Sequence, residues 1–370
     1  MVSKRIIHLI PTLERGGSEM SQLRMLPLLG TEVESVFVTI GPKGSLAPRF
    51  EEQGIKVFSL EQSGPFDFPS YPRMIRLIRE LEPDLVVTHL LYADLIGRFI
   101  IQYFLPCRVI ASLATTYNFP QYFWARVIER VSKYCASGYI ANAEIVKKTY
   151  VEHFGVPEQK ITVLTTGMDT SLFRALSPDE ALRNELGISV HDTVFICVAN
   201  LHINKGHTYL LSAFEQVHRT HPHTKLLLVG DGLERASLEN QSRSSEARDA
   251  IRFLGQRSDV PKLLGLSHVF VLPTFFEGMC NAIMEAMAAG LSVVTSDIPE
   301  NRELITHEQT GLLCPVKDVT SLVLALTRLL DHPEERRRFG EAASESIQGR
   351  YELHASAQRW KHFFLSSSNV

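Results

Sequence analysis

The chain alternates short apolar, β-rich runs with helical segments of about 10–15 residues. A parallel strand needs a crossover connection before the next strand, so this pattern predicts parallel sheets covered by helices. The strands predicted in the first half are 5–10, 34–40, 56–60, 84–90, 108–116, 138–143 and 161–167. The pattern restarts with predicted strands 193–200, 225–230, 251–255, 269–273, 291–296 and 310–315. The sequence therefore predicts an α/β protein of two doubly wound domains.

A polar stretch, MDTSLFRALSPDEALRNELGISVHD, separates the two halves of the chain. We place the domain boundary inside it, which gives a first domain of residues 1–172 and a second of residues 173–350. Residues 351–370 then form a separate final helix with apolar residues on roughly one side. A length of 370 residues is consistent with two domains.

Composition argues against several classes of protein. A net charge of −3 lacks the basic excess of nucleic-acid-binding proteins, so we expect no nucleic-acid partner. The five cysteines show no C-x-x-C pair and no metal spacing, which is typical of buried thiols in a reducing compartment. No apolar run is long enough to span a membrane, so we expect a cytoplasmic protein.

The segment 269–290, VFVLPTFFEGMCNAIMEAMAAG, carries the strongest functional signal. A strand leads into a polar loop with Glu277 and Gly278, and a helix follows. This arrangement binds phosphates and other anions in parallel sheets. Glu285 lies two turns into that apolar helix, where a charge should be paired or bind something, such as the hydroxyls of a ribose. The alternative is a solvent-facing loop acid and a paired core acid.

Four weaker motifs follow other predicted strands. The GGSE motif brings Gly16 and Gly17 to a strand–helix turn, where the backbone can approach a ligand closely. The NKGH motif places Lys205 at a helix N-terminus, which suits a phosphate. Gly230 opens a G-D-G turn that could line a nucleotide pocket. His89 ends the strand 84–90 and is a candidate general acid or acceptor ligand. Each motif also has a structural alternative. The glycine pair can be a tight strand–helix turn, and Lys205 can be a solvated surface lysine. The G-D-G sequence can be an ordinary turn, and His89 can be a structural histidine.

Taken together, these motifs resemble the family 4 retaining glycosyltransferases (glycosyl transferases group 1), which have the GT-B fold. In that fold two Rossmann-like domains face each other across a cleft, and the last helix crosses back to the first domain. The matching segments cover nearly the whole chain in the family's order: ERGGSE, VANLHINKGH, LLLVGDG, IRFLGQRSDVPKLL, PTFFEGMCNAIMEAMAAGLSVVTSDIPENRELI and TGLLCP. The second domain matches more specifically than the first.

The resemblance implies a role for each matching residue. Glu285 would bind the ribose of a nucleotide-sugar donor, and Glu277 would lie at the transferred sugar. Lys205 would neutralise the diphosphate, and Gly17 would let the backbone approach it from the first domain. Leu254 and its neighbours would contact the base.

The resemblance also implies a role for the loop after strand 269–273. Its backbone N–H groups would lie near the sugar and the diphosphate; the residues are Gly278, Met279, Cys280 and Asn281. The family usually has an arginine just before the lysine loop. Here the candidate positions hold Asn200 and His202.

The implied activity is retaining, hexosyltransferase-type transfer from a nucleotide sugar, with UDP favoured, to a hydroxyl acceptor. The first domain would bind the acceptor, a glycan or a lipid-linked saccharide of polysaccharide or cell-envelope synthesis. No cofactor and no metal are expected, and the sequence has no Asp-x-Asp motif. Two other functions stay open: a nucleotide-sugar 2-epimerase of the same architecture, and a non-catalytic partner that binds sugar nucleotides.

The segment 119–134, FPQYFWARVIERVSKY, interleaves aromatic residues with Arg126, Arg130 and Lys133. Such a helix can lie on an anionic membrane surface, which would place the protein peripherally at the inner face of the membrane. The alternative is a core-packed helix with a solvated basic face.

Overall fold

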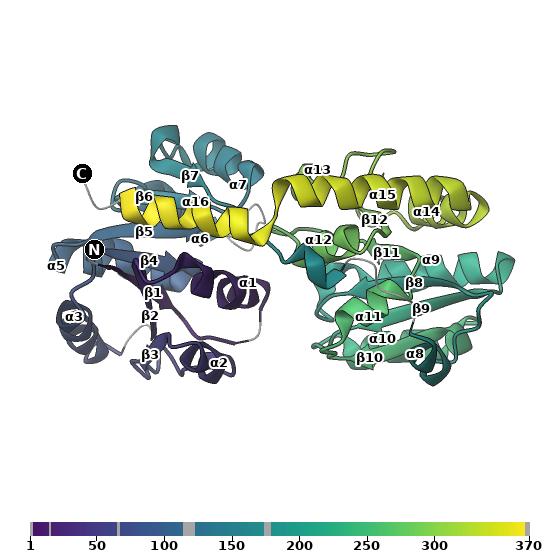
Figure 1. The fold of residues 1–370 in the computed structure, drawn as a ribbon, viewed down its shortest axis with the longest axis horizontal. Helices are drawn as coiled ribbons and strands as arrows, with labels where there is room; N and C mark the ends of the chain where they lie inside the picture. The colour runs from purple at the N-terminus through teal and green to yellow at the C-terminus, as the bar shows by residue number, and fades with distance from the viewer. Residues whose placement is uncertain (1–2, 15, 65–66, 114–122, 174–178, 367–370) are drawn as a thin grey trace. The chain divides into compact units, whose positions relative to one another are not determined.

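The computed structural model describes residues 3–14, 16–64, 67–113, 123–173 and 179–366, and the chain divides into two compact units (Figure 1). The first unit comprises Met1–Met168 and Leu353–Val370, and the second comprises Asp169–Glu352. Each unit is built around one sheet whose described strand pairs are all parallel. The two parallel sheets predicted from the sequence are thus confirmed.

The sheet of the first unit has the strand order β3-β2-β1-β4-β5-β6-β7. Its strands are β1 (Lys4–Ile10), β2 (Val33–Thr39), β3 (Lys56–Ser59), β4 (Leu85–His89), β5 (Arg108–Leu113), β6 (Gly138–Ala141) and β7 (Ile161–Val163). The order changes direction between β1 and β4, which pair with each other. In open sheets of this kind, ligands bind beyond the carboxyl ends of the strands at such a switch point.

The sheet of the second unit has the order β10-β9-β8-β11-β12-β13. Its strands are β8 (Thr193–Val198), β9 (Thr224–Val229), β10 (Ile251–Gly255), β11 (Val269–Leu272), β12 (Ser292–Ser296) and β13 (Gly311–Cys314). The switch point lies between β8 and β11. The loops that follow these two strands therefore lie at the favoured ligand position of this unit.

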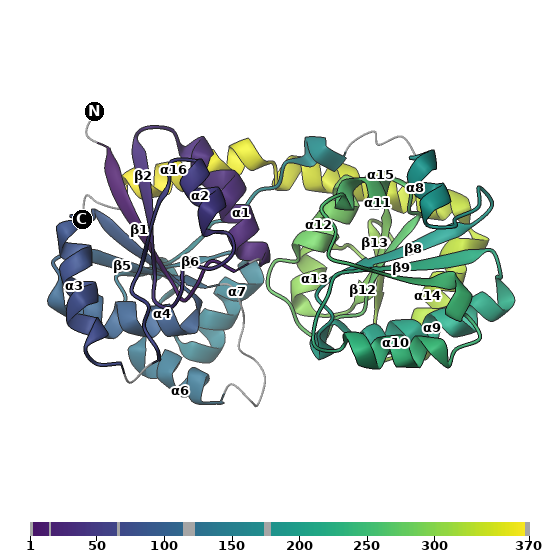
Figure 2. The ribbon, with the colours of Figure 1, turned by 90° about the horizontal axis from the view of Figure 1, so that it is seen from below.

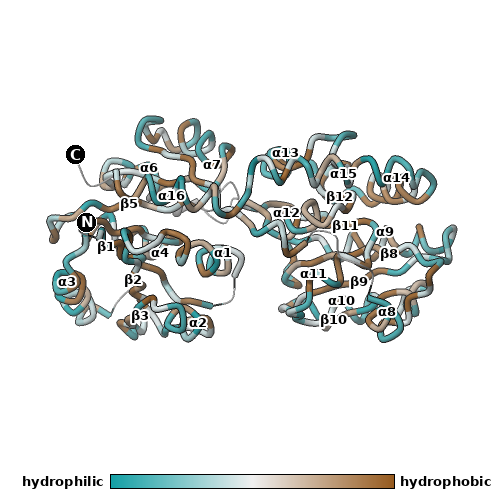
Figure 3. Tube along the Cα trace, viewed as in Figure 1, coloured by the Kyte–Doolittle hydropathy of each residue, from teal (hydrophilic) through white to brown (hydrophobic). Residues whose placement is uncertain are grey.

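Most strands are apolar along nearly their whole length because helices cover both faces of each sheet. β4, β11 and β12, for example, are buried at every residue. Figure 3 shows the same contrast, with the strands mostly brown and many helices alternating between teal and brown. Continuous burial of this kind distinguishes a parallel sheet from an antiparallel one with a solvated face.

The helical segments of the first unit are α1 (Gly17–Met25), η1 (Leu26–Leu29), α2 (Ala47–Glu52), α3 (Ser70–Glu80), α4 (Leu90–Ile96), η2 (Gly97–Ile101), α5 (Gln102–Phe104), α6 (Phe123–Ser132), α7 (Glu144–Thr149), η4 (Tyr150–Phe154), η5 (Glu158–Lys160) and α16 (Leu353–Ser366). The helix after β4 begins at Leu90 and continues as the π-helix η2. The predicted strand 161–167 ends at Val163, because β6 offers only Gly138–Ala141 for pairing.

The helical segments of the second unit are η6 (Thr170–Phe173), α8 (Glu180–Glu185), η7 (Ile203–Lys205), α9 (His207–Thr220), α10 (Arg235–Arg243), η8 (Arg248–Ala250), α11 (Val260–Gly265), α12 (Asn281–Ala288), α13 (Pro299–Leu304), α14 (Val319–Asp331) and α15 (Pro333–Arg350). Two separate helices, α14 and α15, follow β13. Pro333 disfavours helical geometry at His332, so α14 ends there and α15 starts with the proline in its first turn.

The last helix, α16, packs on the sheet of the first unit. Trp360 and Phe364 are only 4% and 1% exposed and belong to one apolar core with residues of β1, β2 and α1. The indole N–H of Trp360 donates to the carbonyl oxygen of Thr165 at 3.2 Å. The final segment of the chain is therefore part of the first unit's core.

Trp360→Ala is expected to destabilise the first unit by about 3–5 kcal/mol, because it removes a buried indole, leaves a cavity and frees the Thr165 carbonyl. Urea unfolding followed by far-UV circular dichroism measures the change. Gln358→Ala, an exposed change on the same helix, is the matched control. Equal midpoints for the two variants would contradict the core role of Trp360.

Candidate active site

Two loops of the second unit are fastened together at the switch point. The loop after β8 offers the carbonyl oxygen of Asn204, which accepts from the Thr274 hydroxyl at 3.0 Å. The same oxygen accepts from the backbone N–H of Phe275 at 2.7 Å. Thr274 is fully buried, so this junction is protected from water. It fixes the lysine loop against the loop that follows β11.

Gly206 is required for this junction. Its φ of +72° lies in the left-handed region, which favours glycine. A Cβ atom here would also collide with the carbonyl oxygen of Pro273 and touch the ring of Phe275. The glycine of the NKGH motif therefore lets the two loops approach each other closely.

This close approach brings Lys205 and Glu277 together. The Lys205 ammonium donates to Glu277 Oε1 at 2.5 Å, and the two side chains are 19% and 10% exposed. Burial opposes the charge on Lys205, but the adjacent Glu277 carboxylate outweighs it, so the pKa of Lys205 is raised. Lys205 is therefore a fixed cation at neutral pH. The structure pairs two residues that the sequence predicts to share a site.

The loop after β11 leads directly into α12. Gly278 and Met279 are half-buried, and Cys280 occupies the N-cap position before Asn281. The first turn of an α-helix directs its N–H groups toward its amino end, where they favour an anion. Burial raises the pKa of the Cys280 thiol to about 12. This cysteine is thus a neutral thiol at neutral pH and not a thiolate nucleophile.

Glu285 lies on α12, on the same chain segment as Glu277. It is half-buried, whereas Met284 and Ala286 beside it are buried. The carboxylate therefore keeps some access to solvent while its neighbours in the helix pack into the core. Such a position suits a group that receives a polar ligand.

The turn after β9 packs against the loop after β8. A Cβ on Gly230, whose φ is +134°, would collide with the carbonyl oxygen of Ala199. The N–H of Gly230 also donates to the Gly255 carbonyl at 2.8 Å, next to the half-buried Leu254. Gly230 and Leu254 are thus brought close to the β8 loop, as the predicted nucleotide pocket requires.

Asn200 and His202 lie on the same β8 loop, and both are exposed. His202 Nδ1 is 2.8 Å from the side-chain oxygen of Asn204, the residue next to Lys205. Neither residue carries the permanent charge of an arginine. In the loops after β8 and β11 the structure pairs Lys205 with a carboxylate, and beside the G-D-G turn it pairs Arg235 with Asp231 at 3.0 Å.

In the first unit, the GGSE motif follows β1. Gly16 is the N-cap residue of α1 and Gly17 is its first residue. A Cβ on Gly16 would collide with the carboxylate of Glu19, a buried residue whose pKa is raised by that burial. The motif therefore starts a helix at the switch point of the first sheet, as predicted.

His89 lies inside the first unit, with both ring nitrogens engaged. Its Nε2 is 3.1 Å from His8 Nδ1, and its Nδ1 is 3.2 Å from the amide nitrogen of Gln22. Burial lowers the pKa of His89 to about 4, so the ring is neutral at neutral pH. These contacts are those of a structural histidine. A role for His89 in acceptor chemistry stays a prediction.

Two family models match the chain on either side of the polar stretch. Residues 15–172 match the model described as Glycosyltransferase Family 4, and residues 178–346 match that of Glycosyl transferases group 1. The chain belongs to glycosyltransferase family 4. The resemblance predicted from the sequence motifs is confirmed.

Curated relatives of this glycosyltransferase include two bacterial enzymes. The chain is 27% identical over 277 residues to the UDP-Gal:α-D-GlcNAc-diphosphoundecaprenol α-1,3-galactosyltransferase of Escherichia coli. The aligned residues cover 72% of this chain and 71% of the relative. The chain is 31% identical over 219 residues to a glycogen synthase of Mycobacterium tuberculosis, which covers 58% of this chain. The match spans about half of the synthase, 51% of its length.

Solved structures share the fold along nearly the whole chain. The Anabaena protein HepE in complex with UDP-glucose superposes with a TM-score of 0.86 at 21% identity, which covers 98% of this chain and 99% of that one. The lipopolysaccharide outer core galactosyltransferase WaaB gives a TM-score of 0.72 at 16% identity and covers 97% of this chain and 99% of that one. The GT-B fold is therefore shown for this glycosyltransferase.

A second buried ion cluster was not visible in the sequence. Arg98 of the π-helix η2 contacts Glu129 of α6 at 2.5 Å and Asp94 at 3.5 Å, and all three side chains are almost fully buried. The Ser132 hydroxyl of α6 lies 2.9 Å from Arg98. Burial raises the pKa of Asp94 to about 8 despite Arg98. In sequence, Asp94 and Arg98 look like an ordinary helix-surface pair.

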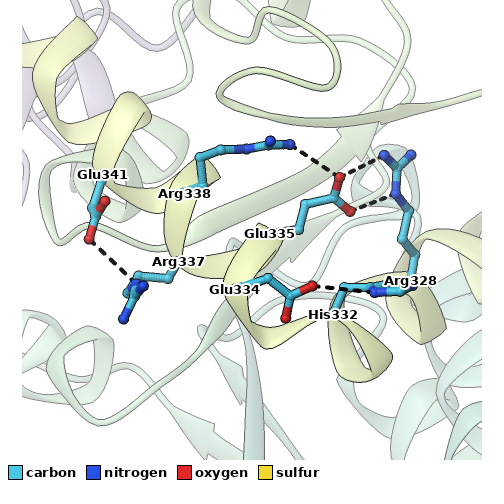
Figure 4. A pocket seen from close by; sticks show the side chains of 7 residues that line it. All are labelled: Arg328, His332, Glu334, Glu335, Arg337, Arg338 and Glu341. Atoms are coloured by element: carbon cyan, nitrogen blue, oxygen red, sulfur yellow. Dashed lines mark hydrogen bonds and ion pairs between the residues drawn. The ribbon is translucent and has the colours of Figure 1, made fainter.

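A large hollow in the second unit lies away from these loops, on α14 and α15 (Figure 4). It measures about 620 Å³, and its walls are mostly charged side chains that pair with one another. Arg328, for example, bonds Glu335 at 2.7 Å, and Arg338 bonds the same carboxylate at 3.3 Å. The paired charges make this hollow a surface ion network. Within the ranges that the structure describes, no three His, Cys, Asp or Glu side chains are grouped as a metal site needs.

The buried histidine pair predicts acid-sensitive stability. His8 and His89 have lowered pKa values in the folded unit but titrate near 6.5 when unfolded, so unfolding takes up protons below that pH. Stability is expected to fall by up to about 1.4 kcal/mol per pH unit for each histidine as the pH drops from about 6.5 toward 4. Urea titrations between about pH 7 and 4.5 measure this slope.

The double change of His8→Phe and His89→Leu should remove the part of this slope that the pair contributes, even where absolute stability falls. A residual slope is expected from His207 and His268, whose pKa values burial lowers to about 4. His153→Gln, at an exposed position, is the control. An unchanged slope in the double variant would show that the pair does not govern acid sensitivity.

Proposed function

We propose that this glycosyltransferase moves a sugar from a UDP-sugar to a hydroxyl of a glycan or lipid-linked saccharide, with retention and without a metal. The Lys205–Glu277 pair is the observation that carries the proposal. It joins a held cation and a carboxylate at the switch point of the second sheet. The cation suits a diphosphate, and the carboxylate suits the hydroxyls of a sugar.

The names of similar proteins support the donor and the acceptor. The E. coli relative uses UDP-Gal and a diphosphoundecaprenol-linked acceptor, and the solved structure of HepE contains UDP-glucose. In the second unit, Gly230 and Leu254 would line the base and Glu285 would hold the ribose. A first unit that binds a lipid-linked acceptor would work peripherally at the inner face of a membrane. No helix of the described chain is long and apolar enough to cross one.

In the proposed mechanism, the diphosphate of the donor replaces Glu277 as the partner of the Lys205 ammonium. Without donor, the ammonium is neutralised by Glu277. A bound diphosphate would take over the ammonium and free the carboxylate to accept hydrogen bonds from the sugar. Lys205 and the N-terminus of α12 would then offset the charge that develops on the leaving group.

Retention follows from displacement on one face of the sugar. The bond from the anomeric carbon to the diphosphate oxygen breaks, and the bond to the acceptor oxygen forms on the same side. The acceptor's proton passes to the departing diphosphate oxygen, so no enzyme nucleophile is needed. Glu277 would orient the sugar and stabilise its positive charge.

Glu277→Gln and Lys205→Ala are each expected to lower kcat by at least about a hundredfold, because each removes a charge used at the transition state. Their effects on UDP affinity should differ in direction. Lys205→Ala should weaken UDP binding, whereas Glu277→Gln should preserve or tighten it by releasing Lys205. Transfer assays with UDP-sugars and calorimetric titration with UDP measure both effects.

Lys225→Ala, a change on β9 away from these loops, is the control. Near-normal turnover in both site variants would overturn the assignment. Conversion of the sugar with donor alone would identify an epimerase instead. UDP binding without any Glu277-dependent transfer or donor hydrolysis would identify a non-catalytic binding partner.

Transfer in the presence of EDTA is expected to proceed at the wild-type rate and to convert an α-linked donor into an α-linked product. The physical reason is that Lys205 and the helix N-terminus supply the positive charge. The anomeric proton coupling in the NMR spectrum of the product reports the configuration. A β-linked product, or activity that EDTA removes and magnesium restores, would contradict this part of the proposal.

A further inference from the structure

Large apolar side chains are exposed together on the first unit. Phe99, Tyr103 and Phe104 come from the continuous helical segment η2–α5 and are 47%, 81% and 55% exposed. Val131 and Tyr134, in α6 and just after it, are 69% and 68% exposed. Single exposed apolar residues are common on protein surfaces, but a group of them marks a surface that binds a membrane, a ligand or another protein. We name these five residues the aromatic patch.

The two halves of the aromatic patch are adjacent in space. Phe99, Tyr103 and Tyr134 line one hollow of about 420 Å³, whose wall also includes Lys160. Tyr103 and Phe104 stack edge to face with ring centroids 5.0 Å apart. Three of the five patch residues thus line one shallow pocket, with Phe104 stacked against Tyr103, and α6, which carries Val131, runs along the outer margin of its unit in Figure 2.

A rigid support lies beneath the patch. Arg98 bonds Glu129 and Ser132, which point from α6 into the unit and are fully buried. Val131 leaves a different side of α6 from Glu129 and Ser132 because of helical periodicity, and Tyr134 follows the end of that helix. The buried ion cluster therefore locks η2 to α6 and presents the apolar side chains of both outward.

The charges around the patch are basic. Residues 97–104 contain no carboxylate, and the only one in 127–134 is Glu129, which is buried against Arg98. Arg130 is exposed, and the Lys133 ammonium lies 5.1 Å from the centre of the Tyr134 ring. On neighbouring segments, Glu152 and Glu158 are paired with lysines at 3.9 and 3.1 Å. The net effect is an apolar surface edged by positive charge.

We propose that the aromatic patch is a docking surface for an anionic lipid bilayer. Aromatic rings favour the boundary between headgroups and acyl chains, and neighbouring lysines and arginines attract anionic lipid. The pocket with Lys160 would receive a phosphate headgroup between the rings. A protein partner would need a complementary acidic surface, whereas a bilayer of anionic lipids offers negative charge and apolar depth together.

The patch shares Val131 and Tyr134 with the segment 119–134 predicted from the sequence, and adds Phe99, Tyr103 and Phe104 of η2 and α5 to it. The pocket lies where β5, β6 and β7 begin, at the amino edge of the sheet. Residues 97–104 are not part of the predicted membrane contact, and residues 119–122 of the predicted segment lie outside the described structure. This proposal rests on the proposed function at one point only, the lipid-linked acceptor. Binding to a bilayer itself needs no substrate.

Co-sedimentation of the full chain with vesicles tests the proposal. Strong binding is expected to vesicles of phosphatidylcholine with phosphatidylglycerol, and weak binding to phosphatidylcholine alone or at high salt. Joint substitution of Phe104→Ser and Val131→Ser should lower the partition coefficient at least about fivefold. Arg130→Gln and Lys133→Gln should each lower it about fivefold at low salt.

Leu324→Ser is the matched control, because Leu324 is 65% exposed on α14 of the second unit. All variants should keep the melting temperature and its increase with UDP, so a failure of the docking surface is distinguishable from a failure of the proposed function. No binding to anionic vesicles, or equal binding by wild type and patch variants, would overturn the proposal. So would a dimer in light scattering that the patch variants dissociate without any effect on vesicle binding.

Discussion

A half-buried ammonium must stay charged if it is to bind a phosphate, and that requirement governs the arrangement of the second unit. Burial alone would lower the pKa of Lys205, and the carboxylate of Glu277 reverses the effect. The carboxylate can reach the ammonium only because Gly206 lets one loop pass within contact of the other. The parallel sheet then places both loops at its switch point, so the chemistry depends on strand order as much as on side chains.

Much of the fold could be predicted from the sequence, because the burial of a strand determines which residue types it contains. Strands covered on both faces become continuous apolar runs, and those runs marked, in order, all thirteen strands of the part of the chain that the structure describes. Boundaries were less certain. The pattern predicted a strand at 161–167, but only Ile161–Val163 pair with β6. Strand length depends on what the neighbouring strand offers, and a single stretch of sequence does not contain that information.

The candidate site was predictable to the extent that its residues are close in sequence or form part of a motif. The lysine and the glutamate stand on separate motifs, and the resemblance predicted a common site for them. The His8–His89–Gln22 contacts and the Arg98–Glu129 pair could not be predicted, because residues distant along the chain meet only in the folded unit. The aromatic patch shows the same limit, since helical periodicity alone does not say which face of η2 and α6 is covered.

The two buried ion pairs also show how a structural charge differs from a functional one. Arg98 has a fully buried side chain, and its guanidinium is surrounded by Asp94, Glu129 and Ser132. Lys205 instead faces one carboxylate and keeps 19% of its side-chain surface exposed. In the proposed mechanism an anion would displace Glu277 from Lys205 without unfolding anything, and the released carboxylate would become available to a sugar. The Lys205 side chain is buried enough to be held in place, and part of it stays exposed. This partial exposure would let the pair bind a donor.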